Sequence, residues 1–186
     1  AITYSFTRPE NTQRFTTFSA GTHAVPLAMP MSEDRSVLRT SLVPQLLEAA
    51  AYNGNRKNAD LALLEIGKVF HASERKVTAQ PVELTMLGLV LTGSLSDSSV
   101  GASARKVDFF DLKGAVESVL DELGLQAEFR ADSPDGFHPG RSASLYLTSA
   151  PDKRVGVLGQ LHPQLQREYD LNDTYAAEIC LDELYD

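Results

Sequence analysis

The order of extended and helical segments is the feature that most constrains the fold. Three strand candidates follow one another over residues 127–130, 142–148 and 154–161. The links between them are too short to hold the crossover helix that a parallel pair of strands requires. Two further candidates, 61–70 and 84–92, are also joined without a helix. The pattern therefore predicts an α+β fold, a mostly antiparallel sheet flanked by helices, and argues against a doubly wound α/β fold.

Helical periodicity is clearest over residues 109–123, where one apolar stripe has a period near 3.6. The stripe consists of Phe109, Leu112, Val116, Val119, Leu120 and Leu123. Asp108 is a good N-cap and Gly124 a good C-terminal stop. A second helix is predicted to have Pro44 in its first turn and to end near 53–55, because Asn-Gly-Asn is a turn signal.

The remaining elements carry weaker signals. We predict short helices over 7–15 and 163–169, and strands over 1–6, 25–28 and 175–181. Residues 93–103 (GSLSDSSVGAS) are rich in Ser and Gly and are predicted to be a mobile surface loop. We assign residues 1–186 to a single domain. Because the chain starts without Met, inside what reads as a strand, we interpret it as part of a longer protein.

Composition excludes several function classes. No apolar run approaches the roughly 18 to 20 residues that span a bilayer, so no membrane partner is expected. The net charge is −8, and residues 168–186 hold seven acids and no Lys or Arg. Such a chain lacks the broad basic face of an autonomous nucleic-acid binder, although a local basic patch remains open.

Motifs for independent chemistry are also missing. The single cysteine, Cys180, excludes an internal disulfide and a cysteine metal cluster, and its apolar surroundings predict a buried, inert thiol. The four histidines have no metal-ligand spacing, so no metal site is predicted. The sequence contains neither a Walker loop nor a GxSxG elbow.

Two segments concentrate charged residues near turn signals. In residues 137–142 (FHPGRS), a turn at Pro-Gly is predicted to present His138 and Arg141 on either side. These side chains are candidates for a phosphate or carboxylate on another chain, or for bonds to local carbonyls. Arg35 and Arg39 lie in residues 32–39 (SEDRSVLR), where ligand binding and a capping network are the two alternatives.

Six strings, in this order and spacing, resemble the core of the beta subunit of bacterial phenylalanyl-tRNA synthetase, over nearly the whole chain. They are residues 31–42 (MSEDRSVLRTSL), 53–57 (NGNRK), 64–70 (LEIGKVF), 107–114 (VDFFDLKG), 137–143 (FHPGRSA) and 156–163 (GVLGQLHP). The resemblance implies a class II synthetase-like fold. It also implies a cytoplasmic alpha2beta2 enzyme whose alpha subunit activates phenylalanine with ATP and Mg²⁺ and charges tRNA(Phe). In such an enzyme the beta copy of the fold is a degenerate relative of the catalytic domain.

The resemblance also points to two positions where catalytic class II domains grip ATP with arginine. One strand ends in Gly-Arg-Val-Tyr-Arg in the related alpha subunit, and here His71 stands where the last Arg would be. The other string, Gly-x-Gly-x-Glu-Arg, is similar to residues 178–183, where both glycines are gone and Glu183 stands at the Arg position. A histidine lacks the bidentate fork of arginine, and a carboxylate repels a triphosphate. We therefore expect no catalytic residue and no bound cofactor in this domain.

Three hypotheses follow for function. The leading one is a non-catalytic scaffold that pairs with the catalytic alpha subunit. The second is a direct tRNA-contacting module, and the third is an autonomous nucleotide-binding ligase domain, which the missing arginines oppose. Arg35, Arg39, His138 and Arg141 are the candidate contacts to the alpha subunit or to tRNA.

Overall fold

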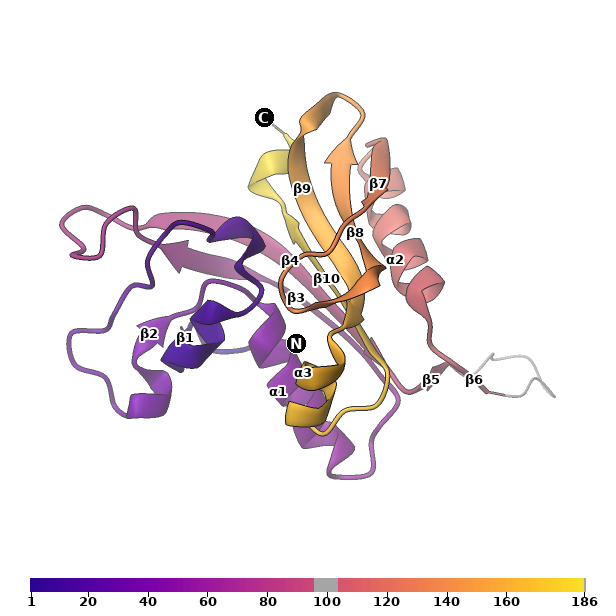
Figure 1. Cartoon of the computed structure of the whole chain (residues 1–186), viewed down its shortest axis with the longest axis horizontal. Coiled ribbons are helices and arrows are strands. Elements are labelled where there is room, and N and C mark those ends of the chain that lie inside the picture. The colour runs from indigo at the N-terminus through magenta and orange to yellow at the C-terminus, as the bar shows by residue number, and fades with distance from the viewer. Residues whose placement is uncertain (96–103, 186) are drawn as a thin grey trace.

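The computed structural model describes residues 1–95 and 104–185 and has one central sheet (Figure 1). Its six strands are β3 (Leu61–His71), β4 (Val82–Thr92), β7 (Ala127–Ala131), β8 (Phe137–Leu147), β9 (Ala150–Leu161) and β10 (Thr174–Cys180). They are arranged β3-β4-β10-β9-β8-β7, and every neighbouring pair is antiparallel. This arrangement confirms the predicted α+β class.

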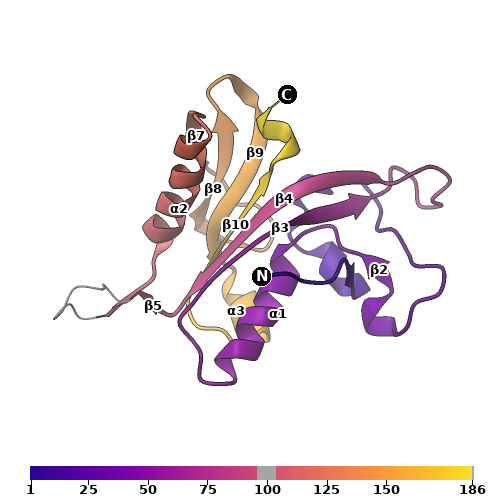
Figure 2. The ribbon, with the colours of Figure 1, turned by 180° about the vertical axis from the view of Figure 1, so that it is seen from behind.

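Helices cover both faces of the sheet. Helix α2 (Phe109–Glu122) packs on β9 and β10, and α1 (Val43–Gly54) packs on β3 and β4, as the two opposite views show (Figures 1 and 2). A short helix, α3 (Pro163–Glu168), follows β9. Two pairs of two-residue strands lie outside the main sheet: β1 (Phe6–Thr7) with β2 (Val37–Leu38), and β5 (Ser94–Leu95) with β6 (Arg105–Lys106).

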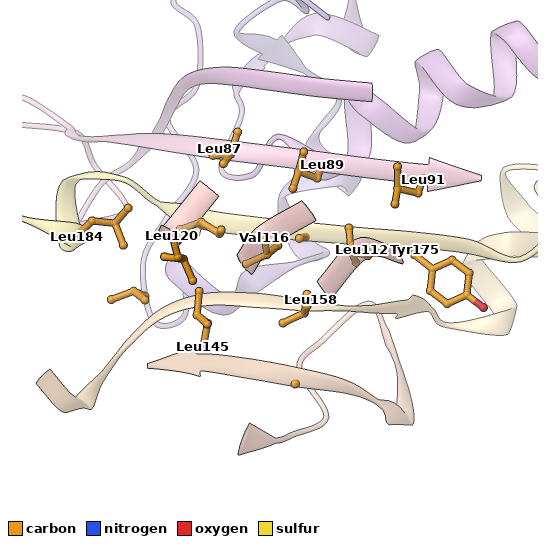
Figure 3. Packing of buried hydrophobic residues seen from close by; sticks show 14 of the residues in the cluster. Leu87, Leu89, Leu91, Leu112, Val116, Leu120, Leu145, Leu158, Tyr175 and Leu184 are labelled. Carbon is orange, nitrogen blue, oxygen red and sulfur yellow. The ribbon is translucent and has the colours of Figure 1, made fainter. Parts of the chain in front are cut away.

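The two faces have separate apolar cores because side chains alternate along each strand. On the α2 face, the buried stripe of α2 meets leucines from three strands (Figure 3). These residues are Leu112, Val116 and Leu120 of the helix, Leu87, Leu89 and Leu91 of β4, Leu145 of β8 and Leu158 of β9. Of the stripe expected from the 3.6 period, these three helix residues are therefore core, Phe109 and Val119 pack against it partly buried, and Leu123 at the helix end is exposed, which corrects the prediction for that residue.

On the other face, which we call the α1 face, the first turns of α1 touch the backbone of the sheet. Leu42, Leu46 and Leu47 pack with Met86 and Val90 of β4. Between those two strand residues stands a glycine. A Cβ on Gly88 would lie 2.9 Å from Cδ1 of Leu46 and 3.0 Å from Cβ of Leu42. The absence of a side chain at this position is thus what allows the helix to approach so closely.

Some sequence predictions were wrong in detail. The expected strand over residues 1–6 is reduced to Phe6–Thr7, and the helix over 7–15 is a short 3-10 helix, Pro9–Gln13. The strand expected over 25–28 is a single bridge between Pro26 and Val37. These N-terminal segments contain few apolar residues with regular spacing, so contacts with the rest of the chain decide their shape.

The predicted Pro139-Gly140 turn is also corrected. The segment belongs to the long strand β8, in which the register with β9 shifts between Phe137 and Ser142. Gly140 has a φ of 92°, a left-handed value that glycine adopts without strain, and it allows this bulge. His138 and Arg141 therefore stand on a strand edge and not on a turn.

The loop predicted over residues 93–103 is described only at its start. Gly93 has a φ of 85° and leads into β5, which pairs with β6 after the segment. The remainder of that prediction, residues 96–103, lies outside the described residues. Over the described ranges, the structure has no helix that is both long enough and apolar enough to cross a membrane.

Candidate functional site

His71 ends β3 on the α1 face, two residues beyond the buried Val69. Its side chain is buried, and burial lowers the pKa of the imidazole below its ordinary value because the charged form loses hydration. Nδ1 is buried and has no hydrogen-bond partner among the described residues. The neutral form is thus favoured at this position, where a phosphate clamp would need a cation.

Glu183 lies in the 3-10 turn Asp182–Leu184 that follows β10. Its carboxylate forms an ion pair with Lys153 of β9. The neighbouring Asp182 accepts a hydrogen bond of 2.7 Å from the amide of Thr85, which fixes the turn to β4. Within the described ranges no hydrogen bond or ion pair joins Glu183 to His71. Glu183 has a cationic partner of its own.

Glu178 is the most unusual residue near these positions, since it is a fully buried carboxylate in the middle of β10. It accepts hydrogen bonds from Ser41 Oγ at 3.0 Å and from the amide of Leu42 at 2.7 Å, at the start of α1. Burial raises the pKa of Glu178 from 4.5 to about 7, although both hydrogen bonds and the charge of Arg39 act in the opposite direction.

Arg39 is the centre of a second buried polar group beside Glu178. Its Nη1 lies 2.9 Å from Oε1 of Glu65 and 2.8 Å from Oγ1 of Thr3, while Nε donates to the carbonyl oxygen of Lys68 at 2.8 Å. A Cβ on Gly67 would lie 2.4 Å from Nη2, so glycine makes room for the guanidinium. Arg39 was predicted as a surface contact, but its guanidinium is buried and hydrogen-bonded within the chain. Contact with another molecule would require these buried hydrogen bonds to break.

The two buried glutamates are aligned across the sheet. Glu65 of β3 and Glu178 of β10 both pair in register with Gly88 of β4, one from each side. Sequence position alone does not reveal that these two residues form a pair. The available signal was a glutamate within each largely apolar strand, because buried carboxylates require compensating partners.

The other three predicted contact residues lie apart from this group. Arg35 donates from Nη1 to the carbonyl oxygen of Phe6 at 3.1 Å. His138 is half-buried on β8, and Arg141 is exposed three residues later, with Nη1 2.8 Å from Oε1 of Gln160. The structure therefore does not gather Arg35, Arg39, His138 and Arg141 into one site.

Arg35 instead borders an apolar groove of about 690 Å³ near the N-terminus. We define the apolar groove by Tyr4, Phe6, Leu27, Met29, Met31 and Arg35. Met29 and Met31 are 90% and 101% exposed, and Tyr4 is 74% exposed. Clustered exposure of large apolar side chains is typical of a surface that another molecule covers.

Neither a metal centre nor a reactive thiol emerges from the described part of the chain. No three His, Cys, Asp or Glu side chains gather there in a way that could hold a metal ion. Cys180 is buried, and burial raises the pKa of its thiol to about 11, so it stays protonated at neutral pH.

Comparison with known proteins identifies the family. Residues 1–181 match the family model described as the phenylalanyl tRNA synthetase beta chain CLM domain. The chain belongs to this family. The phenylalanine--tRNA ligase beta subunit of Listeria innocua is 42% identical to this beta-chain CLM domain over 188 residues, and that of Shouchella clausii is 39% identical over 187 residues. All of this chain is covered in both comparisons, but only 23% and 22% of the relatives' lengths.

Solved structures confirm the class II synthetase-like fold of this CLM domain. A pyrrolysyl-tRNA synthetase from Desulfitobacterium hafniense, PylSc, superposes with a TM-score of 0.66 at 14% identity, over 99% of this chain and 58% of that one. A second structure of pyrrolysyl-tRNA synthetase from the same organism gives a TM-score of 0.63. At this level of identity the likeness concerns the fold alone.

Proposed function

We propose that this domain is a non-catalytic scaffold that pairs with the alpha subunit in a cytoplasmic alpha2beta2 phenylalanine-tRNA ligase. In this proposal the alpha subunit activates phenylalanine with ATP and Mg²⁺ and charges tRNA(Phe). The beta-chain CLM domain contributes surface and rigidity and takes no part in the chemistry.

The buried carboxylate of Glu178 carries the proposal. It stands at the position where the related catalytic string has its first glycine. Its side chain lies on the α1 face and accepts hydrogen bonds from Ser41 and from the amide of Leu42. Leu42 and Leu46 pack directly against the neighbouring Gly88, so the helix and the Glu178 side chain fill this part of the sheet face. A face filled in this way leaves no room for a nucleotide.

His71 and Glu183, which stand where catalytic class II domains grip ATP with arginine, support the same proposal. The environment of His71 favours a neutral imidazole, and Glu183 carries a negative charge that Lys153 balances. Stabilisation of the developing charge by fixed cations is a large part of phosphoryl and adenylyl transfer, and loss of one such donor typically costs about 3–4 kcal/mol of barrier. Two substitutions of this kind are sufficient to explain an inactive domain.

The apolar groove is the surface that we assign to the alpha subunit. Tyr4, Met29 and Met31 expose apolar area that is hydrated in the isolated domain, and Arg35 adds a cation at its border. Apolar residues with an arginine at the edge are the usual composition of a stable protein interface.

Subunit association tests this proposal. We would introduce Met31→Glu into a full-length beta subunit that carries this sequence and measure how much alpha subunit co-purifies. Burial of an unpaired charge at the contact should weaken association at least tenfold. Glu122→Gln, at the end of the distant helix α2, is the control and should leave association unchanged. Normal association of the Met31→Glu variant would contradict the assignment of the groove.

The tRNA-contact alternative has its own test. Binding of tRNA(Phe) to the isolated domain over a salt series would show a steep decrease of affinity with salt if several phosphates were contacted. With a net charge of −8, we expect no such binding at physiological salt.

A further inference from the structure

The α2 face of the sheet ends in a cavity that the proposed scaffold role does not use. This cavity of about 500 Å³ lies at the N-terminal end of α2, and we call it the α2 cavity. Six of its lining residues carry aromatic rings or polar groups: Asp108, Phe109, Phe110, Phe129, Arg141 and Tyr175. Its volume lies within the roughly 300–1,000 Å³ typical of sites for small molecules.

Aromatic rings form one side of the α2 cavity. Phe109 and Phe110 meet edge to face, with ring centroids 5.7 Å apart, and Phe129 of β7 lines the same space. Phe110 is 75% exposed although it is one of the largest apolar side chains. A planar ring that enters the cavity would cover these phenylalanines and find the edges and faces that aromatic pairs prefer.

Arg141 supplies a positioned cation. Its Nη1 donates to Oε1 of the buried Gln160 at 2.8 Å, and Nε2 of Gln160 in turn donates to Oδ1 of Asp173 at 3.0 Å. In the described residues Gln160 is the only side chain that hydrogen-bonds to Arg141. The guanidinium is therefore held in place while its other N–H groups remain available, which suits a carboxylate.

Tyr175 supplies an unused hydroxyl beside this cation. It pairs in register with Gln160, is 8% exposed, and its hydroxyl has no hydrogen-bond partner among the residues described. Figure 3 shows its oxygen pointing away from the leucines of the core. The hydroxyl reaches the surface at the cavity wall, so it can donate to a ligand oxygen that takes the place of water there. Burial raises the pKa of Tyr175, which keeps the group a donor.

Acidic groups near the cavity restrict the ligand. Asp173, Asp108 and Asp111 all act on Tyr175, and among the residues that the structure describes only Asp111 of these three has a cationic partner, Arg105. Oδ1 of Asp108 accepts the amides of Phe110 and Asp111, which leaves its second oxygen as an acceptor. These acids weaken the binding of a ligand that carries only a carboxylate, whereas a zwitterion balances both signs and binds more tightly.

We infer that the α2 cavity binds a free aromatic amino acid. The ring packs against Phe109, Phe110 and Phe129. The carboxylate lies on Arg141 and accepts from the hydroxyl of Tyr175, and the ammonium group lies at Asp108. This inference is independent of the scaffold proposal, because it concerns the other face of the sheet.

Equilibrium dialysis with L-phenylalanine tests the inference on the full-length beta subunit co-purified with its alpha subunit. The count of bound molecules per beta chain is compared between the wild type, Arg141→Gln and Phe110→Ala. Both residues are exposed, so these variants should fold. Each variant should lose one site per beta chain, or bind there at least tenfold more weakly. Arg130→Gln, which removes an exposed arginine paired with Glu128 outside the cavity, should keep the wild-type count.

Two truncated probes identify the group that Arg141 binds. Arg141→Gln should weaken 3-phenylpropionate, which lacks the ammonium group, at least tenfold at this site, and should change 2-phenylethylamine, which lacks the carboxylate, less than twofold. An equal number and affinity of sites in the wild type and Arg141→Gln would overturn the inference. So would equal weakening of both probes, or the loss of the same site in Arg130→Gln.

Discussion

Nη1 of Arg39 lies 2.9 Å from Oε1 of Glu65, and both side chains are almost completely buried, with 4% and 3% exposure. The pair connects the segment before α1 to β3. Buried ion pairs stabilise little relative to apolar residues, but removal of one partner leaves an uncompensated charge and typically costs about 3–5 kcal/mol.

We therefore expect Arg39→Met to lower the free energy of unfolding by about 3–5 kcal/mol, measured by urea denaturation of the 186-residue chain. Lys68→Met is the matched control, because Lys68 pairs with Glu83 at 3.5 Å on the exposed surface. An exposed pair contributes at most about 1 kcal/mol. Similar small losses in both variants would contradict the buried role of Arg39.

The close approach of α1 to the sheet gives a second prediction. Gly88→Ala places a methyl group 3.0 Å from Cβ of Leu42, which cannot rotate away, and should destabilise the chain by about 1–3 kcal/mol. Gly114→Ala in α2 is the control. It has no atom within 4 Å of the added Cβ and should stabilise the chain by about 0.5–1 kcal/mol. Thermal unfolding of both variants would show shifts of opposite sign; a stabilised Gly88→Ala variant would refute the tight contact.

The raised pKa of Glu178 predicts how the free energy of unfolding depends on pH. Its pKa is about 7 in the folded chain against an ordinary value of 4.5, so the folded state binds the proton more tightly than the unfolded state. This contribution is complete below pH 4.5 and is lost as the pH rises through about 7. A shift of this size corresponds to about 3 kcal/mol.

Glu178→Gln keeps the shape of the side chain and removes the titration. We compare the free energy of unfolding of the variant with that of the wild type at two pH values. The variant minus wild-type difference should be about 2–3 kcal/mol larger at pH 8 than at pH 5, because the wild type loses the stabilising proton between them. Burial lowers the pKa of His71, which makes stability decrease toward acid pH, but this contribution is common to both proteins and cancels in the difference. A difference that does not change with pH would show that Glu178 is ionised throughout.

Strong periodicity made most of the fold predictable. The stripe containing Leu112, Val116 and Leu120 is buried as expected, and α2 ends within one residue of its predicted boundary. Asp108 accepts from the amides of Phe110 and Asp111, as an N-cap should. Each of these features is local, so the sequence contains the whole signal.

The candidate site was less predictable because it depends on contacts distant in sequence. Arg39 and Glu65 are 26 residues apart, and Ser41 and Glu178 are 137 residues apart. Sequence position alone suggested that Arg39 is a surface residue; only the pairing of the strands shows that Glu65 and Glu178 flank Gly88. The sequence did mark Arg141 as unusual, but the bulge at Gly140 that places it on the sheet edge was taken for a turn.

Pyrophosphate exchange by the isolated domain, at saturating phenylalanine and ATP, tests the central claim of a non-catalytic domain most directly. We expect no exchange above the enzyme-free background from the wild-type domain. We expect none from His71→Arg either, because a single restored cation leaves Glu183 in place and catalytic groups act as a unit. The assembled alpha and beta subunits, assayed in parallel, should exchange. Robust turnover by the isolated domain would contradict the scaffold role and make this domain an enzyme.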